Sequence, residues 1–288
     1  MKFKKSKTDF SADKLPSTRK QLFFDIYKNR FWLISGLGFI LFVSLLPFII
    51  VYAIGNLKVY ELNLKATEGI ISVADASKEI FSMISARNLA LIPCLILFAV
   101  GFSGVAGIIR RLVWQEGIIF WSDFFKSLKE NAFSFSVIAF VIGCLNYLLQ
   151  YSARSLYFRE GFSAQASTCV SIIALAIILL ITPCFITQST VYNLPFFGKL
   201  KNAFMLSMRA PLKSFILLIV NVSPCFTLLI PGKYAFTACC VLLPIFIMPA
   251  QIIVNTLCCD SVLDEYVNKN NFKEIYKKGL YNAENNDD

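Results

Sequence analysis

Histidine is absent from this chain of 288 residues, and charged residues are scarce. Without histidine, the chain lacks the commonest general base, the commonest metal ligand and the side chain that changes charge near neutral pH. Charged residues make up 16% of the chain, against roughly 25% in soluble domains. Because 57% of the residues are apolar, this composition excludes a soluble globular protein and indicates a membrane protein.

Several catalytic motifs are also missing. Serine or cysteine nucleophiles activated by histidine and histidine-containing zinc motifs are excluded, and neither G-x-x-x-x-G-K-[ST] nor G-x-G-x-x-G occurs. Ion-coupled transporters place ionisable residues inside the membrane, whereas the long apolar runs here contain no Asp, Glu, Lys or Arg. We therefore expect no enzymatic activity, no cofactor or metal, and no nucleic-acid partner.

Six runs without charge are each long enough, or nearly long enough, for a helix to cross the bilayer core. They are Phe31 to Leu57, Asn88 to Ile109, Asn131 to Ala153, Gly161 to Gly198, Ser214 to Gly232 and Tyr234 to Cys259. We place the spans near 31–54, 88–110, 133–152, 168–192, 213–231 and 234–258. The predicted fold class is all-α, a polytopic membrane bundle with both termini on one side.

The basic residues predict which side that is. Of the 28 Lys and Arg residues, 21 lie in the N-terminal tail, the second and fourth connections, and the C-terminal tail. Only 7 lie in the three opposite loops, so the positive-inside rule puts both termini in the cytoplasm. We predict a basic tail over 1–30, a transmembrane domain over 31–258, and a solvated acidic tail over 259–288.

The loops differ in length and pattern. In the external loop over 55–87, apolar residues from Ile70 to Ile84 recur at helical spacing, which predicts an amphipathic helix on the outer surface or capping the bundle. Two cytoplasmic segments, 113–131 and 194–211, are rich in Phe and Lys and are expected at the membrane interface.

These cytoplasmic segments share a repeated pattern. Phe124 to Phe133 aligns with Phe196 to Phe204, and Phe23 to Phe31 is a weaker copy. The pattern predicts three helical hairpins in parallel, each introduced by a short interfacial helix. The alternative is that any inward loop before a span collects Lys and Phe.

Residues 104–131 resemble the most characteristic segment of the YesL-like bacterial membrane proteins. In that family a helix ends in Arg, a turn with Gly follows, and Asp-Phe-Phe leads to Lys and Asn before the next span. Those positions here are Arg110 or Arg111, Glu116-Gly117, Asp123-Phe124-Phe125, Lys129 and Asn131. A second stretch, from Leu194 to Pro211, is also similar. The resemblance implies a multi-pass protein of the bacterial plasma membrane, linked to carbohydrate-uptake genes and without an established chemical activity.

Our leading hypothesis is a non-catalytic accessory or assembly subunit for carbohydrate uptake. Its expected partners are the lipid bilayer and the subunits of a carbohydrate transporter. The expected partner contacts or interfacial anchors are Arg110, Arg111, Asp123, Phe124, Phe125 and Asn131.

The alternative is a passive or partner-energised transporter of small solutes. Its path would follow polar residues inside the predicted spans, namely Asn146, Gln188 and Asn221. Six prolines inside the spans could kink helices around such a path, or could simply be tolerated in membrane helices. The nine cysteines form no C-x-x-C pair and are interpreted as small buried apolar residues. A membrane enzyme ranks third and would need a cluster of polar side chains at one membrane face.

Overall fold

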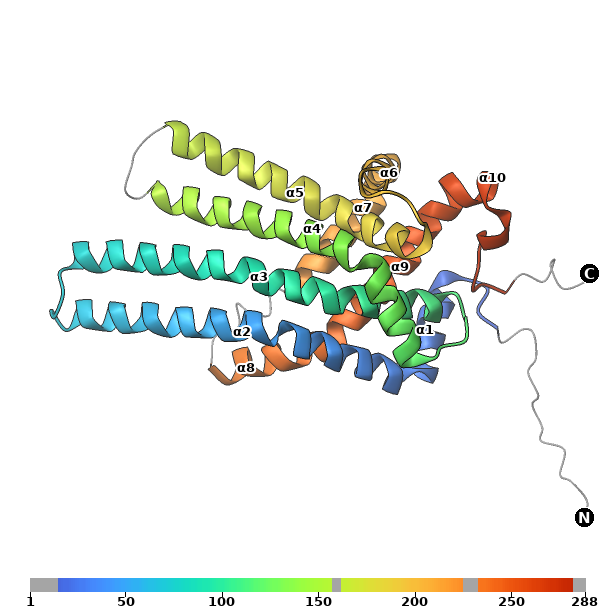
Figure 1. The fold of residues 1–288 in the computed structure, drawn as a ribbon, viewed down its shortest axis with the longest axis horizontal. Coiled ribbons are helices and arrows are strands. Elements are labelled where there is room, and N and C mark those ends of the chain that lie inside the picture. The colour runs from blue at the N-terminus through green and yellow to red at the C-terminus, as the bar shows by residue number, and fades with distance from the viewer. Residues whose placement is uncertain (1–14, 157–161, 225–232, 282–288) are drawn as a thin grey trace, which may run out of the picture.

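The computed structural model describes residues 15–156, 162–224 and 233–281, and in these ranges the chain forms helices and turns without a strand (Figure 1). The first five helices are α1 (Arg19–Asn29), α2 (Phe31–Thr67), α3 (Val73–Val113), α4 (Phe120–Ser155) and α5 (Phe162–Val191). The later helices are α6 (Phe196–Arg209), α7 (Pro211–Val222), α8 (Lys233–Leu242), α9 (Met248–Leu263) and α10 (Lys269–Asn271).

Five helical stretches among the described residues are long and apolar enough to cross a membrane. A sixth candidate is the pair α6 and α7, which pass the same test together but meet at an angle of 105°. The predicted all-α, polytopic membrane bundle is therefore confirmed, with five or six spans.

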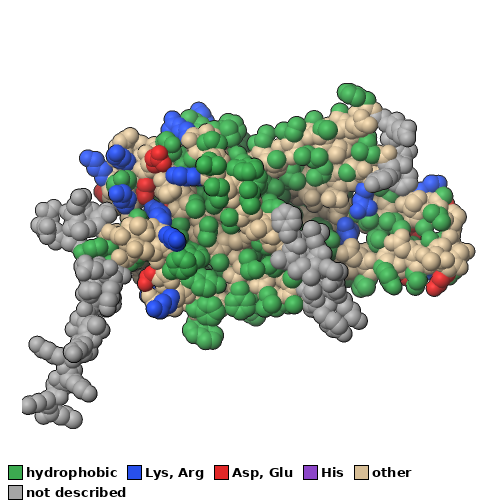
Figure 2. Space-filling model, turned by 180° about the vertical axis from the view of Figure 1, so that it is seen from behind, with side chains coloured by type: hydrophobic (Ala, Val, Ile, Leu, Met, Phe, Trp, Pro, Cys, Tyr) green, Lys and Arg blue, Asp and Glu red, His purple; other side chains and the backbone are tan. Residues whose placement is uncertain are grey.

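The bundle has two distinct ends. Figure 1 shows α2–α3 and α4–α5 as two long antiparallel hairpins, with α1, the α3–α4 turn and α10 gathered at one end, which we call the tail end. The described ends of the chain also meet there, because the Tyr281 N–H donates to the Pro16 carbonyl over 3.0 Å. The opposite end, which holds the turn over 68–72, is the far end. Figure 2 shows charged side chains gathered at the tail end and largely uncharged surface along the middle of that face.

The expected amphipathic surface helix over 55–87 is wrong. Helix α2 continues to Thr67 and α3 starts at Val73, with only a tight turn between them. At 37 and 41 residues these helices are about 55 and about 61 Å long, against a bilayer core of about 30 Å. The physical reason is that Lys58 ends the charge-free run without ending the helix, because no Gly or Pro occurs over 56–67.

A short separate helix is present before the span in two of the three repeats, and its place at the membrane interface stays a prediction. Helix α1 is separate and starts with a capping box between Thr18 and Gln21. Helix α6 is separate as well, and Pro211 begins α7. In the second repeat, the expectation is wrong. The interfacial segment runs into the span as one helix, α4, because nothing after the Asp123 cap interrupts it.

The last span contains two local departures from α-helical geometry. Leu243–Ile247 and Asp264–Asn268 are π-helical turns on either side of α9. Pro249 has no N–H with which to bond the Ile245 carbonyl four residues earlier. That carbonyl lies so close to Gly38 of α2 that a Cβ at Gly38 would overlap it. The connection between the predicted spans near 213–231 and 234–258 falls almost entirely outside the described residues.

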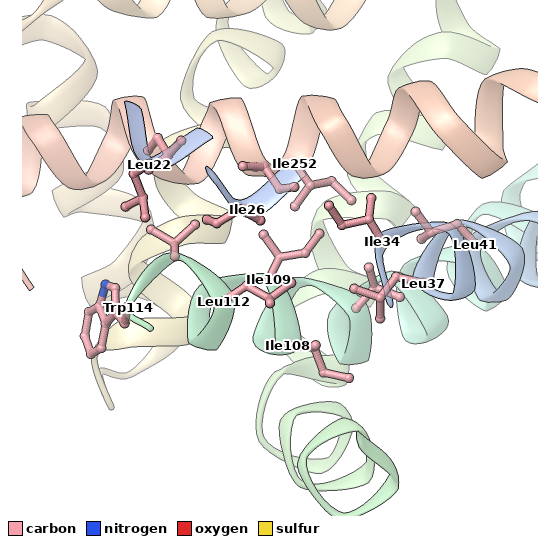
Figure 3. Close-up of a cluster of buried hydrophobic side chains, with 14 of the residues drawn as sticks. Leu22, Ile26, Ile34, Leu37, Leu41, Ile108, Ile109, Leu112, Trp114 and Ile252 are labelled. Atoms are coloured by element: carbon pink, nitrogen blue, oxygen red, sulfur yellow. The ribbon is translucent and has the colours of Figure 1, made fainter. Parts of the chain in front are cut away.

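The main apolar core lies at the tail end (Figure 3). Leu22 and Ile26 of α1, Leu37 of α2, Ile109 of α3 and Ile252 of α9 are buried in one cluster. Helix α1 is thus part of the bundle, although its sequence lies within the predicted N-terminal tail. Its apolar face supports the charged residues described below.

Candidate functional site at the tail end

A cavity of about 220 Å³ lies between the tail-end parts of α3, α4 and α5. We call it the polar pocket, and it is lined by Gly107, Arg110, Arg111, Asp123, Lys126, Ser127, Glu130, Asn131, Thr190 and Val191. The pocket brings together four of the six predicted contact residues: Arg110, Arg111, Asp123 and Asn131. It lies at the level where the charge-free runs of α3 and α4 end, which is where lipid head groups begin.

Small residues bring α3 and α4 close together beside this pocket. A Cβ at Gly107 would overlap the Ser127 side chain. The Ser127 hydroxyl donates to the Ser103 carbonyl over 2.9 Å, and the Asn131 amide donates back to the Ser127 carbonyl over 3.1 Å. Asn131 is buried and bonds to Ser127 within α4, so it is a structural group of this helix and not a surface group.

Ion pairs engage some of the charged groups around the pocket. Arg111 pairs with Asp123 over 3.1 Å, and Arg110 pairs with Glu116 over 3.2 Å. The Asp123 carboxylate also accepts the Ile119 N–H over 2.8 Å, which caps α4. Within the described residues, Lys126 and Glu130 take part in no ion pair or hydrogen bond, and both are exposed. The pocket therefore offers, one helical turn apart, a cation and an anion that form no ion pair within the described residues, although Glu130 still acts electrostatically on Arg110.

A second group of polar side chains lies beside the first, and we call it the Arg19 cluster. It consists of Arg19, Trp114, Tyr192, Asp260, Asp264 and Asn268. The three residues from the last span are spaced at i, i+4 and i+8 and lie on one buried face. Arg19 of α1 pairs with Asp264 over 2.5 Å and lies 3.6 Å from Asp260.

Hydrogen bonds complete this cluster. The Trp114 indole donates to Asp260 over 3.1 Å, and the Asn268 amide donates to Asp264 over 2.8 Å. The Tyr192 hydroxyl donates to the Asn268 side-chain carbonyl. Burial and the nearby carboxylates Asp260 and Asp264 raise the pKa of the Tyr192 phenol, so it remains protonated and able to donate. Each buried carboxylate thus accepts a hydrogen bond and faces the Arg19 guanidinium, as burial requires, while the buried Nη1 of Arg19 has no hydrogen-bond partner within the described residues.

Trp114 connects the Arg19 cluster to the polar pocket. The Arg110 guanidinium and the Lys278 ammonium each lie 4.6 Å from the centre of the Trp114 ring system. Lys278 also pairs with Glu116 over 2.7 Å. The segment after α10 therefore binds at the same point as the pocket residue Arg110.

The interpretation of the segment 259–288 as a solvated tail is wrong for its first part, because the last span continues to Asn271 and buries Cys259, Asp260, Val262, Leu263, Asp264 and Asn268. Asp260 and Asp264 are 3% and 7% exposed. Their burial depends on Arg19, which lies more than 240 positions earlier in the chain and is invisible to any local pattern. Their spacing with Asn268, directly after an apolar run, is the one signal that could have found them.

The two predicted aromatic contacts differ in position. Phe124 is 6% exposed, with its ring against Gly104, so it packs inside the bundle. Phe125 is 53% exposed and stacks with Trp121, which is 62% exposed, with the ring centres 6.1 Å apart. We call Trp121 and Phe125 the aromatic pair.

The predicted intramembrane amides lie at different helix contacts. Gln188 is buried and donates to the Lys199 carbonyl between α5 and α6. Asn221 and Asn255 exchange hydrogen bonds of 2.8 and 3.2 Å between α7 and α9. Asn146 lies half-buried on α4. The contacts of Gln188 and Asn221 join helices to one another.

No family model, curated protein or solved structure matches this chain. The resemblance to the YesL-like proteins therefore stays a prediction. The length and hydropathy of the helices establish a multi-pass integral membrane protein.

Proposed function

We propose that this protein is a non-catalytic subunit of a membrane assembly and that it binds a partner membrane protein at its tail end. The observation that carries the proposal is the aromatic pair, Trp121 and Phe125, exposed on the first two turns of α4. Aromatic side chains dominate the binding energy of protein interfaces, because they bury a large area with little loss of side-chain entropy.

The aromatic pair is held rigidly. Asp123 and the buried Phe124 lie between Trp121 and Phe125 in the sequence, and the Asp123 carboxylate accepts the Ile119 N–H at the start of the helix. Arg111, paired with Asp123, lies beside them. This combination of exposed rings with an adjacent polar group matches the apolar centre and polar rim of an interface.

The charged groups of the tail end support a structural role. The paired charges join α3 to α4, α1 to the last span, and the C-terminal segment to the α3–α4 turn. An accessory subunit needs such a stable surface. We propose the cytoplasm as its location, because most Lys and Arg residues lie on this side. A carbohydrate transporter in a bacterial plasma membrane is the partner that the resemblance implies.

A pull-down from the native membrane in mild detergent, followed by mass spectrometry, tests the proposal. The wild type should recover transporter subunits, and Trp121→Ala with Phe125→Ala should lower their recovery about tenfold. Phe133→Ala is the matched control, because Phe133 is 74% exposed on the same helix but lies two turns further into the span. The control should recover the partner normally.

Two results would overturn the proposal. One is a partner that remains fully bound to the double variant. The other is recovery of the wild type alone at good yield, which would shift support to the transporter hypothesis and call for solute-uptake measurements in vesicles.

A further inference from the structure

We propose that the polar pocket binds the phosphoethanolamine head group of a phospholipid in the leaflet at the tail end. The argument rests on the level of the pocket in the membrane, its free charges and its size. It does not depend on the identity of a protein partner.

The level of the pocket is that of lipid head groups. Gly107 and Arg110 lie where the charge-free run of α3 ends, and Asn131 lies where that of α4 begins. Charged residues line the pocket on the tail side of this boundary, and apolar helix continues on the other side.

The free charges favour a zwitterion. Arg110 and Arg111 are partly neutralised by Glu116 and Asp123, which leaves Lys126 and Glu130 without an ion-pair partner in the described chain. A simple anion would be attracted by Lys126 and repelled by Glu130. A simple cation would be attracted by Glu130 and repelled by Lys126. A group with both charges satisfies both residues at once.

Phosphoethanolamine has the required chemistry. Its phosphate accepts hydrogen bonds from Lys126 and from the remaining N–H groups of Arg110 and Arg111, as arginines bind phosphate. Its ammonium group donates to Glu130. Phosphocholine has a quaternary ammonium without an N–H and cannot make that bond. The cavity of about 220 Å³ holds roughly seven waters at about 30 Å³ each, so a small head group fits.

Native mass spectrometry of the purified full-length protein, titrated with defined lipids, tests this inference. The wild type should retain phosphatidylethanolamine about tenfold better than phosphatidylcholine of the same acyl chains. Glu130→Ala should remove that preference, because no side-chain oxygen is then left at this position to accept the ammonium N–H. Lys126→Ala should weaken both lipids about equally by removing a phosphate contact.

The matched control is Lys129→Ala, which removes an exposed charge of the same helix outside the pocket lining. It should leave the lipid preference unchanged. Soluble phosphoethanolamine should displace the lipid only at much higher concentration, because it lacks the acyl chains; equal potency would point to a soluble ligand and overturn the assignment to a lipid.

Three further outcomes would overturn it. These are equal retention of the two lipids by the wild type, preferential binding of phosphatidylglycerol, and a loss in Lys129→Ala as large as that in Lys126→Ala. The wild-type comparison needs no variant, so the inference stays testable even if a substitution prevents folding.

Discussion

The indole N–H of Trp114 donates a hydrogen bond to the buried carboxylate of Asp260 over 3.1 Å. This bond ties the end of α3 to the last span. Arg110 of the polar pocket stacks on the same indole, so the pocket and the Arg19 cluster meet at one side chain. Helix α1, the end of α3, the last span and the C-terminal segment are therefore joined at the tail end.

Trp114→Phe keeps the ring and removes the N–H donor. The buried Asp260 then loses a hydrogen bond, which should lower the free energy of unfolding by about 1–3 kcal/mol. Denaturant unfolding of the purified protein in detergent measures this. Trp121→Phe is the control, because Trp121 is 62% exposed, and its effect should stay within about 0.5 kcal/mol. Equal effects of the two substitutions would contradict the importance of the Asp260 bond.

The contact between α2 and the π-helical turn at Leu243–Ile247 predicts a contrast between two glycines. A Cβ at Gly38 would overlap the Ile245 backbone, whereas a Cβ at Gly36 would meet nothing within 4 Å. Gly38→Ala should therefore destabilise the protein by about 1–3 kcal/mol, since the backbone must shift. Gly36→Ala should be neutral or slightly stabilising. Thermal unfolding in detergent compares them, and an unaffected Gly38→Ala would mean that the two helices are not in close contact.

The fold class and five of the six spans could be predicted from the sequence, because absence of charge over about 20 residues is a local property. The predicted span near 213–231 differs: its described part, α7, ends at Val222 and passes the test for a span only together with α6, which it meets at 105°. The end of α2 and the start of α3 could not be predicted. Lys58 and Arg87 mark the ends of charge-free runs, and a helix can continue past such a charge. The polar pocket lies partly within the 104–131 segment, where one turn folds α4 back on α3. Two features could not be predicted from local patterns: the contact of the pocket with α5, and the whole Arg19 cluster. Both depend on packing between segments that are far apart in the sequence.

The exchange of hydrogen bonds between Asn221 and Asn255 predicts a stability effect that depends on both residues. Asn221→Leu leaves one amide without its partner and should cost about 0.6–2 kcal/mol. The double variant with Asn255→Leu should recover most of this loss, because no amide is then left unpaired. A double-mutant cycle measures the coupling. If the stability losses of the two single variants simply add in the double variant, the two amides do not depend on each other. That result is expected if they line a solute path.

The proposed orientation predicts opposite accessibility at two turns. An epitope inserted after Gly69, in the turn at the far end, should be cleaved by protease added to intact cells. An epitope inserted after Gly117, in the α3–α4 turn, should be protected until the membrane is opened. Both glycines have open space around them, so insertion should not disturb packing. The reverse pattern would place the tail end outside the cytoplasm.

Site-specific photo-cross-linking in the native membrane tests the central claim most directly. A photoreactive residue replaces Phe125 in one variant and Phe133 in another, since both side chains are exposed on α4. The account predicts a protein adduct of defined mass from position 125 and lipid adducts from position 133. Lipid adducts alone at both positions would contradict a partner-binding surface at the tail end.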